Sequence, residues 1–499
     1  MEQKKRKIND AEAYRAISGV FKKRRKGMTV ADMVAKTALP IETVRGLIND
    51  VADEYSARIS VSESGEILYS FPSGFTSRYR GFRVLAGRAL GKIGRALAMI
   101  GTGLFKAWIM IMLVGYFVLF MLIALAALVL SAAASNSSNS NNRRNNSGGG
   151  LVFVSGIFDF IIRIWFYSEL TKSLDRRRYG VYGRPEPRPK GKPLYKAIFS
   201  FVFGDGDPNA AIETRERQAV IAYIQANKGL ISLPEFMILT GTGGNEADSL
   251  VSAYCSEYGG MPEATEDGTV VYRFDALLLQ ADRAGPSPGG FSTPLKLPEK
   301  FSQNKTKMNI WFCIINSVNL IFGSYFFVNA MNSGHILTER HFSAASFLYA
   351  RTYVMTGHFI ANPLPFISIG LGVVPLVFSL FFWLIPLARY ALLKKNNEKI
   401  KLENLRKNAF MFIWDNPSAV KPGDINPAQK ECRPKNMDTA RERVIKDMCQ
   451  YSVPDVSVNE AGETVYSFNE LKREKDALAK CRSGVGPGSS ELGKIIFRA

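Results

Sequence analysis

Four stretches of the chain are apolar enough to predict membrane-spanning helices, and they occupy residues 108–130, 151–167, 309–331 and 367–387. About 20 consecutive apolar residues cross the hydrocarbon core of a bilayer, and the first stretch reaches that length without a charged side chain. The second stretch is shorter and carries Asp159 and Arg163, which lie four residues apart and can pair on one helix face. It is predicted to span, with a helix in the membrane interface as the alternative. The pattern predicts two membrane hairpins of two spans each.

Lysine and arginine residues predict how these spans are oriented. They are concentrated before the first span, after the second, before the third and after the fourth, whereas the outer loops 131–150 and 332–366 carry few of them. Loops rich in positive charge stay on the cytoplasmic side of a membrane. Both termini and the segment between the hairpins are therefore expected to be cytoplasmic, in a multi-pass protein of the inner (cytoplasmic) membrane.

The segment 73–107, directly before the first span, alternates basic and apolar positions. Arg88, Lys92 and Arg95 share one helix face, and Arg83 precedes them. A basic amphipathic helix can lie on an anionic lipid leaflet. We expect these four residues to contact the membrane surface.

A pattern of alternating side chains recurs three times outside the apolar stretches and predicts β-hairpins. The sequences VSESGEILYSF, ATEDGTVVYRF and VNEAGETVYSF stand at 61–71, 264–274 and 458–468. Each has a glycine six residues before its last phenylalanine, at a two-strand turn where a positive φ is favoured. Helical patterns precede the hairpins, and a charged stretch is the candidate first helix of the third. The sequence thus predicts one module repeated at 10–72, 213–283 and 421–480.

Helices followed by a two-stranded hairpin resemble the winged-helix superfamily. The whole chain, including FGDGDPN at 203–209, is similar to a family of uncharacterised bacterial multi-pass membrane proteins that interleave such repeats with membrane hairpins. The resemblance implies a fold of α-helical membrane hairpins combined with α+β winged-helix cytoplasmic domains. The remaining segments are a basic cytoplasmic linker at 168–212, a linker at 284–308, a charged helix and linker at 388–420, and a tail at 481–499.

Composition narrows the classes of function. The chain has 499 residues and a formal charge of +20, from 64 Lys and Arg against 44 Asp and Glu. This excess lies between the predicted modules, so the membrane topology explains most of it. The five cysteines form no CxxC pair, which excludes a zinc ribbon, a ferredoxin and a disulfide scaffold. No catalytic pairing and no cofactor site is indicated, and we expect a protein that is not an enzyme.

In the winged-helix superfamily the third helix often enters the major groove of DNA, where Lys and Arg bind phosphates. The candidate contacts here belong to the first and third repeats: Lys22, Lys23, Arg24, Arg25, Arg45, Arg441, Arg443 and Lys446. The third helix of the second repeat, 245–258, contains Glu246, Asp248 and Glu257 and no basic residue. Binding of protein, or of one module by another, is therefore favoured over DNA binding.

Two other sets of polar residues have both a functional and a structural interpretation. Asp205, Asp207, Asn209 and Glu216 match positions 1, 3, 5 and 12 of a calcium loop, but Ala210 stands where the sharp turn needs glycine. The simpler interpretation is that Asp207 or Asn209 caps the next helix. Asn316 and Asn319 share one face of the third span, where helix–helix adhesion is favoured over an ion or substrate path.

These observations predict a non-enzymatic multi-pass membrane scaffold or adaptor with three cytoplasmic winged-helix-like interaction modules. Its expected partners are the bilayer with its anionic leaflet, and an unidentified cytoplasmic protein or the chain itself. The alternative is a membrane-tethered DNA-binding regulator that uses repeats one and three. A channel or transporter component is the third hypothesis.

Overall fold

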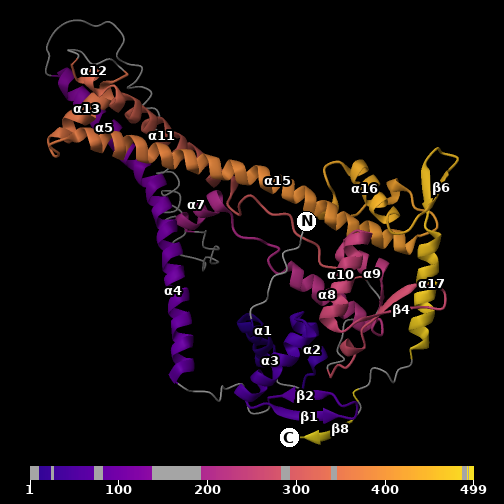
Figure 1. Ribbon diagram of the computed structural model, residues 1–499. Helices are drawn as coiled ribbons and strands as arrows, with labels where there is room; N and C mark the ends of the chain where they lie inside the picture. Colours follow the sequence, from indigo (N-terminus) through magenta and orange to yellow (C-terminus); the bar gives the residue numbers. More distant parts are fainter. Residues whose placement is uncertain are drawn as a thin grey trace, which may run out of the picture. The chain divides into compact units, whose positions relative to one another are not determined.

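The computed structural model describes residues 10–23, 27–71, 82–136, 193–281, 291, 293–338, 345–485, 492 and 494–498 (Figure 1). Most of these residues are helical, and a few short strands form small sheets. The chain divides into two compact units. The module unit comprises Met1–Leu90, Asp207–Glu299 and Lys394–Ala499, and the apolar unit comprises Gly91–Gly206 and Lys300–Leu393.

The N-terminal module (10–71) contains α1 (Asp10–Lys23), α2 (Val30–Thr37), α3 (Ile41–Glu54) and a hairpin of β1 (Arg58–Ser62) and β2 (Ile67–Ser70). Apolar residues recur at helical spacing along α1 and α3, so Ile17, Phe21 and Ile48 are buried in one core. Gly65 takes a φ of +79° in the hairpin turn, a conformation open to glycine without steric cost. The hairpin stands where the sequence pattern predicted it.

The middle module (212–278) contains α8 (Ile212–Ala226), β3 (Leu230–Ser232), α9 (Leu233–Thr240), α10 (Gly244–Tyr258), β4 (Met261–Ala264), β5 (Val270–Arg273) and the short 3-10 helix η2 (Asp275–Leu277). Its strands form an antiparallel sheet in the order β3-β5-β4. Gly260 lies so close to the Phe274 ring that an added Cβ would clash with it. Only glycine therefore allows the chain to pass from α10 into the hairpin over this buried ring.

The C-terminal module (394–484) starts with the last part of α15 (Val374–Asp415). It continues through η4 (Pro422–Asp424), η5 (Lys430–Cys432), α16 (Met437–Cys449), β6 (Asp455–Val458), β7 (Thr464–Ser467) and α17 (Asn469–Gly484). The charged stretch expected to supply its first helix is helical up to Asp415 and buries Leu405, Phe410 and Ile413. Where the other modules have a second helix, this one has three residues of 3-10 helix between two prolines, and proline disfavours helical backbone in the residue before it.

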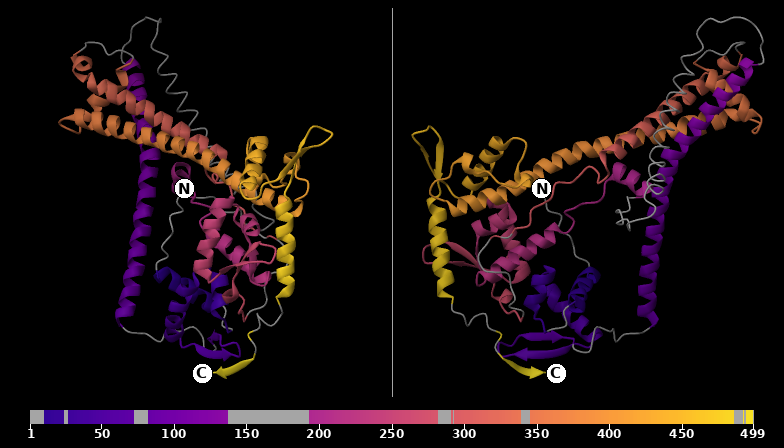
Figure 2. Two further views of the ribbon diagram at one scale, coloured as in Figure 1. Left: turned by 45° about the vertical axis from the view of Figure 1, so that its right-hand side comes forward. Right: turned by 180° about the vertical axis from the view of Figure 1, so that it is seen from behind.

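The end of the chain belongs to the fold rather than to a separate tail. Helix α17 runs past the predicted module boundary at 480, and strand β8 (Ile495–Arg498) pairs antiparallel with β1 (Figure 2). Together β2, β1 and β8 form a three-stranded sheet. This pairing joins residues far apart in sequence, which a local pattern cannot indicate.

The described residues of the apolar unit are mostly helical. Residues 82–136 form one nearly continuous helix, α4 (Phe82–Met110), η1 (Ile111–Gly115) and α5 (Tyr116–Asn136), in which η1 is a π-helical segment. The others are α7 (Leu194–Phe203), α11 (Thr306–Met331), α12 (Ser333–Thr338), α13 (Phe347–Gly357), α14 (Pro363–Pro365) and the π-helical η3 (Phe366–Val373), which continues into α15.

Three of the described helices are long and apolar enough to cross a membrane: Leu97–Ala127, Thr306–Met331 and Pro363–Asp415. They contain most or all of the predicted spans 108–130, 309–331 and 367–387, whereas 151–167, with Asp159 and Arg163, lies outside the described residues. Two predicted boundaries differ from the structure. The basic segment before the first span is not separate from it, because α4 continues into the apolar stretch, and the outer loop 332–366 contains three short helices.

Glycine brings two of these helices into close contact. A Cβ added to Gly323 of α11 would lie 3.0 Å from the backbone nitrogen of Leu376, and one added to Gly372 of η3 would lie 3.0 Å from the Cα of Phe327. Small residues allow close backbone approach in apolar surroundings, where dispersion contacts stabilise helix packing. Phe120 of α5 stacks with Phe322 and Phe326 of α11 beside this contact.

Candidate functional site

Helix α2 begins with a reciprocal capping box formed by Thr29 and Asp32. The backbone nitrogen of Thr29 donates to Asp32 Oδ2 over 2.9 Å, and Asp32 is 3% exposed. The same carboxylate oxygen accepts a bond from the backbone nitrogen of Ala281 (3.0 Å), while Thr29 Oγ1 donates to the carbonyl of Leu279 (2.7 Å). The cap of the N-terminal module therefore also holds the chain that follows the middle module.

A second capping box, in the middle module, makes a similar link. Ser232 and Glu235 cap α9, and Glu235 is 1% exposed. Arg482 of α17 pairs with both carboxylate oxygens of Glu235, at 2.7 and 2.9 Å, and donates to the carbonyl of Leu230 at 2.9 Å. Tyr223 donates to the carboxylate at 2.7 Å, and burial followed by the negative charge of Glu235 raises the pKa of that phenol, so it remains a donor.

The two links share one arrangement. In each, a buried carboxylate at the third position of a helix also binds the segment that follows the hairpin of the next module. Asp32 and Glu235 have the same spacing as Leu47 and Leu250, the apolar positions that align the first two predicted repeats. In the C-terminal module, η5 has no side-chain cap. The sequence analysis missed both links, although the patterns TVAD at 29–32 and SLPE at 232–235 are recognisable capping boxes.

Further contacts join the modules. Tyr258 of the middle module donates to the carbonyl of Ala38 at 3.1 Å, and Gln218 donates to the carbonyl of Lys36 at 2.6 Å. Lys407 of α15 is 3% exposed and pairs with Glu216 of α8 at 2.6 Å. A buried ion pair of this kind needs good geometry to offset desolvation, and here the Lys407 ammonium also donates to a backbone carbonyl.

The calcium-loop candidates are not brought together as a ligand set. Asp205 accepts bonds from Ser200 Oγ (2.6 Å) and the backbone nitrogen of Gln303 (2.7 Å). Asp207 accepts from the nitrogen of Asn209, whose own amide bonds both backbone groups of Leu297, and Glu216 binds Lys407. No group of three or more His, Cys, Asp or Glu side chains in the described residues is placed to hold a metal ion.

The simpler interpretation of that loop is also wrong in detail. The residue before α8 is Ala211, and no side chain caps the helix. Asp207 instead closes a tight turn with the nitrogen two residues later. A local Asx turn of this type competes with capping for the same carboxylate.

The candidate DNA contacts of the N-terminal module are dispersed. Lys22 and Lys23 are exposed at the end of α1, whereas Arg24 and Arg25 lie outside the described residues. Arg45 is exposed on α3 but pairs with Glu42 at 2.9 Å.

The corresponding helices of the other modules differ in charge. On α10 the exposed side chains are polar or acidic and include Asn245, Glu246, Asp248, Ser249 and Ser252. On α16, Arg443 and Lys446 are exposed, whereas Arg441 donates to the carbonyl of Ile425 and pairs with Asp438. The structure therefore leaves a small basic group on α16 and none on the exposed positions of α10.

The two asparagines of α11 are fully buried and hold neighbouring helices. Asn316 Nδ2 donates to the carbonyl of Ser379 in α15 at 3.1 Å, and Asn319 Nδ2 donates to the carbonyl of Leu113 in η1 at 2.8 Å. A π-helical turn shifts the regular hydrogen-bond ladder, which makes a carbonyl such as that of Leu113 available to a side chain. These contacts have the geometry of helix–helix adhesion.

The predicted membrane-surface residues Arg83, Arg88, Lys92 and Arg95 all fall on the single helix α4. Their places on the backbone agree with a basic helix that continues directly into an apolar one.

Comparison with known proteins gives one informative similarity. The chain is 24% identical over 475 residues to an uncharacterized chloroplastic protein of Arabidopsis thaliana, and the match covers 91% of this chain and 80% of the plant protein. No family model and no solved structure matches the chain. The expected bacterial origin thus gains no support, because the similar protein comes from a plant. In its described part the chain is largely helical, with three helices apolar enough for a membrane, and its sequence is similar to that of a chloroplastic protein.

Proposed function

We propose that the protein is a non-enzymatic membrane scaffold whose three winged-helix-like modules bind one another through buried links. The observation that carries this proposal is the repeated use of a capping carboxylate, Asp32 or Glu235, to bind the segment after the hairpin of the next module. The order of helix, strand, two helices and hairpin in the middle module supports the winged-helix assignment. The array leaves other faces, such as that of α10, for a protein partner.

The proposed topology starts from the packing of the module unit. Because its three pieces form one compact unit, we place them in one compartment. The chain must then cross the bilayer an even number of times between Leu90 and Asp207. Helix α4–α5 supplies one crossing, α7 is too short for another, and the predicted span 151–167 supplies the second. Because the Arabidopsis relative is chloroplastic, we extend the predicted location from a bacterial inner membrane to a plastid membrane.

A reporter fused near residue 140 tests this topology. It should report the compartment opposite to a reporter fused at the N-terminus. A fusion near residue 230, on the same side as the N-terminus, is the matched control. A residue-140 fusion in the same compartment as the termini would overturn the two-hairpin arrangement.

The scaffold proposal is tested by photo-crosslinking in native membranes. A photoreactive residue at Ser249 or Ser252 on the exposed face of α10 should give a protein adduct of one defined mass. The same residue at Gly423, on η4, is the control for random collision. Equal adduct patterns at all three positions would contradict a docking face on α10.

The second candidate, a tethered DNA-binding regulator, is favoured by Arg443 and Lys446 on α16. The full chain in neutral-lipid nanodiscs would be titrated with duplex DNA across a salt series. If phosphates are neutralised, affinity falls steeply with salt, with a slope of about −0.9 per phosphate contact. The double substitution Arg443→Gln with Lys446→Gln should then reduce that slope, whereas Lys472→Gln with Arg473→Gln on α17 should not. The scaffold proposal expects no such binding.

A further inference from the structure

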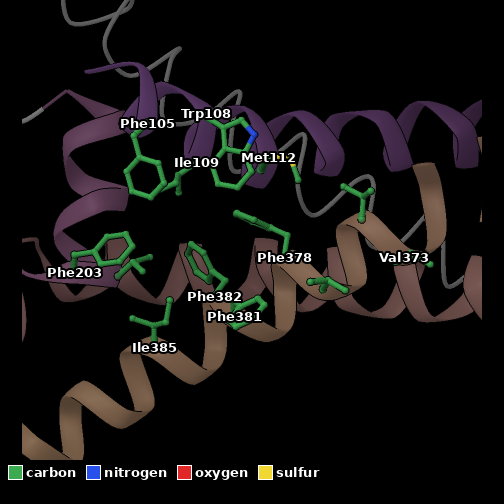
Figure 3. A pocket seen from close by; sticks show the side chains of 13 residues that line it. Phe105, Trp108, Ile109, Met112, Phe203, Val373, Phe378, Phe381, Phe382 and Ile385 are labelled. Carbon is green, nitrogen blue, oxygen red and sulfur yellow. The ribbon is translucent and has the colours of Figure 1, made fainter. Parts of the chain in front are cut away.

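The apolar unit contains a cavity of about 500 Å³ between α4, α7 and α15 (Figure 3). Thirteen side chains line it, and all belong to hydrophobic residues. Phe105 and Trp108 approach it from α4, Phe203 from the end of α7, and Phe378 and Phe382 from α15 (Figure 3). Ligand pockets in proteins span roughly 300–1,000 Å³, so this space has the size of a binding site rather than of a packing defect.

Several of the apolar side chains that line the cavity remain exposed at the surface of the unit. Trp108 is 50% exposed and Phe381 is 58% exposed. Both fall in the apolar helices that are long enough to cross a bilayer. In that environment a hydrocarbon chain is the medium next to these side chains, and water is not.

One end of the cavity carries positive charge. Lys106, adjacent to Phe105, places its ammonium 4.4 Å from the centre of the Phe199 ring on α7. That ring packs 4.9 Å from the Phe203 ring, which lines the cavity. The Lys106 cation is thus separated from the apolar space by the aromatic side chains of α7.

A second cation also contacts α7. Arg389 stands one helical turn after Ile385, a lining residue, and its guanidinium donates to the carbonyl of Phe201 at 3.0 Å. It also lies over the Phe301 ring, 4.3 Å from the centre. An apolar groove bounded at one end by Lys and Arg is complementary to a lipid with a hydrocarbon chain and an anionic headgroup.

We propose that this groove binds an anionic membrane lipid, with one acyl chain in the cavity and the headgroup bound between Lys106 and Arg389. Helix α7, short and apolar, contributes Val202 and Phe203 to the cavity and contacts both cations. The site requires no participation of the modules, so it is independent of the proposed scaffold function.

The test uses the full chain in nanodiscs with Trp108 as the reporter. The other four of the five tryptophans are replaced by phenylalanine. Phosphatidylglycerol brominated on its acyl chain should quench Trp108 more strongly than brominated phosphatidylcholine at equal mole fraction. Unlabelled phosphatidylglycerol should reverse the difference by competition.

Two pairs of variants locate the binding. Val377→Phe fills the cavity and should abolish the preference for phosphatidylglycerol, whereas Val328→Phe, on the exposed surface of α11, should retain it. Lys106→Gln should weaken the preference about fivefold, as expected for one basic residue near an anionic surface, whereas Lys307→Gln should not.

Two results would overturn the proposal. Equal quenching by the two brominated lipids would show contact with bulk lipid alone. Weak quenching by both lipids, together with a disulfide-linked dimer formed through Phe381→Cys, would show that a second copy of the chain covers the groove. The competition experiment uses the chain with Trp108 as its single tryptophan and no substitution in the cavity. It therefore tests lipid binding even where a cavity variant fails to fold.

Discussion

The module unit and the apolar unit bury polar groups in opposite ways. In the module unit, the Glu235 carboxylate accepts two bonds from Arg482 and others from Tyr223 and the backbone of Ser232. In the apolar unit, Asn316 and Asn319 each donate one bond to a backbone carbonyl, and their Oδ1 atoms have no partner among the described residues. The free-energy cost of burying a polar group therefore depends on the environment that the group would otherwise occupy. A carboxylate leaves water and must regain several donors, whereas a neutral amide in the membrane location proposed for α11 would have no water to lose.

The largest expected effect comes from removing one partner of the charged link. Arg482→Ala leaves Glu235 buried without its cation, and we expect a loss of about 3–5 kcal/mol in unfolding free energy. Hydrogen exchange of α9 amides in the full chain would measure it locally. Arg443→Ala on the exposed face of α16 is the matched control and should change exchange by less than about 0.5 kcal/mol. Similar effects from both variants would remove the distinction between a buried and an exposed arginine.

Removing the hydroxyl group of Thr29, the uncharged partner in the first link, should lower the unfolding free energy by less. Thr29→Ala removes the cap of α2 and the bond to the Leu279 carbonyl, so a loss of about 1 kcal/mol is expected. The readout is faster hydrogen exchange both in α2 and in the segment around Leu279. Thr439→Ala, at an exposed position of α16, is the control. Faster exchange in α2 alone would show that the link to the middle module contributes nothing.

The apolar unit should respond more weakly still. Asn319→Leu removes the bond to the Leu113 carbonyl, and interhelical bonds of this kind contribute about 0.6 kcal/mol on average. Asn329→Leu on the same helix is the control, because its amide bonds only the Tyr325 carbonyl of α11 itself. The midpoint of unfolding in a denaturing detergent would be compared for the two. A larger shift in the Asn329 variant would contradict the assignment of Asn319 to helix adhesion.

The smallest expected effect comes from Glu474, a carboxyl group within the module unit. Burial raises the pKa of Glu474, whose carboxylate accepts from the Tyr451 hydroxyl at 2.8 and 3.0 Å. The pKa of Glu474 is therefore higher in the folded than in the unfolded chain. Its contribution to the unfolding free energy is present below the unfolded-state pKa and is lost as the pH rises through the folded-state pKa. Glu474→Gln should therefore stabilise the chain at pH 7, by roughly 0.5 kcal/mol, and leave it unchanged near pH 3. Urea unfolding at the two pH values checks this, and equal effects at both would contradict it.

Much of the local structure could be predicted because it depends on neighbouring residues. The hairpins at 61–71, 264–274 and 458–468 form around glycines with positive φ, as the turn pattern indicated. The apolar helices that lie in the sequence between segments of the module unit were likewise predicted, from the length of uncharged sequence. The calcium-loop candidate failed because matching residue types does not determine where side chains point, and each of these carboxylates found a closer donor.

By itself, the sequence determined the three hairpins and the approximate places of three apolar helices, since turns and hydrophobic length act over a few residues. The capping boxes TVAD and SLPE are recognisable in the sequence, but the distant residues that also bind their carboxylates are not. Only the tertiary structure decided that Ala281 reaches Asp32, that Arg482 reaches Glu235 and that β8 pairs with β1. Such contacts join segments hundreds of residues apart, and they depend on how the burial of many apolar side chains positions whole helices before a single hydrogen bond can form.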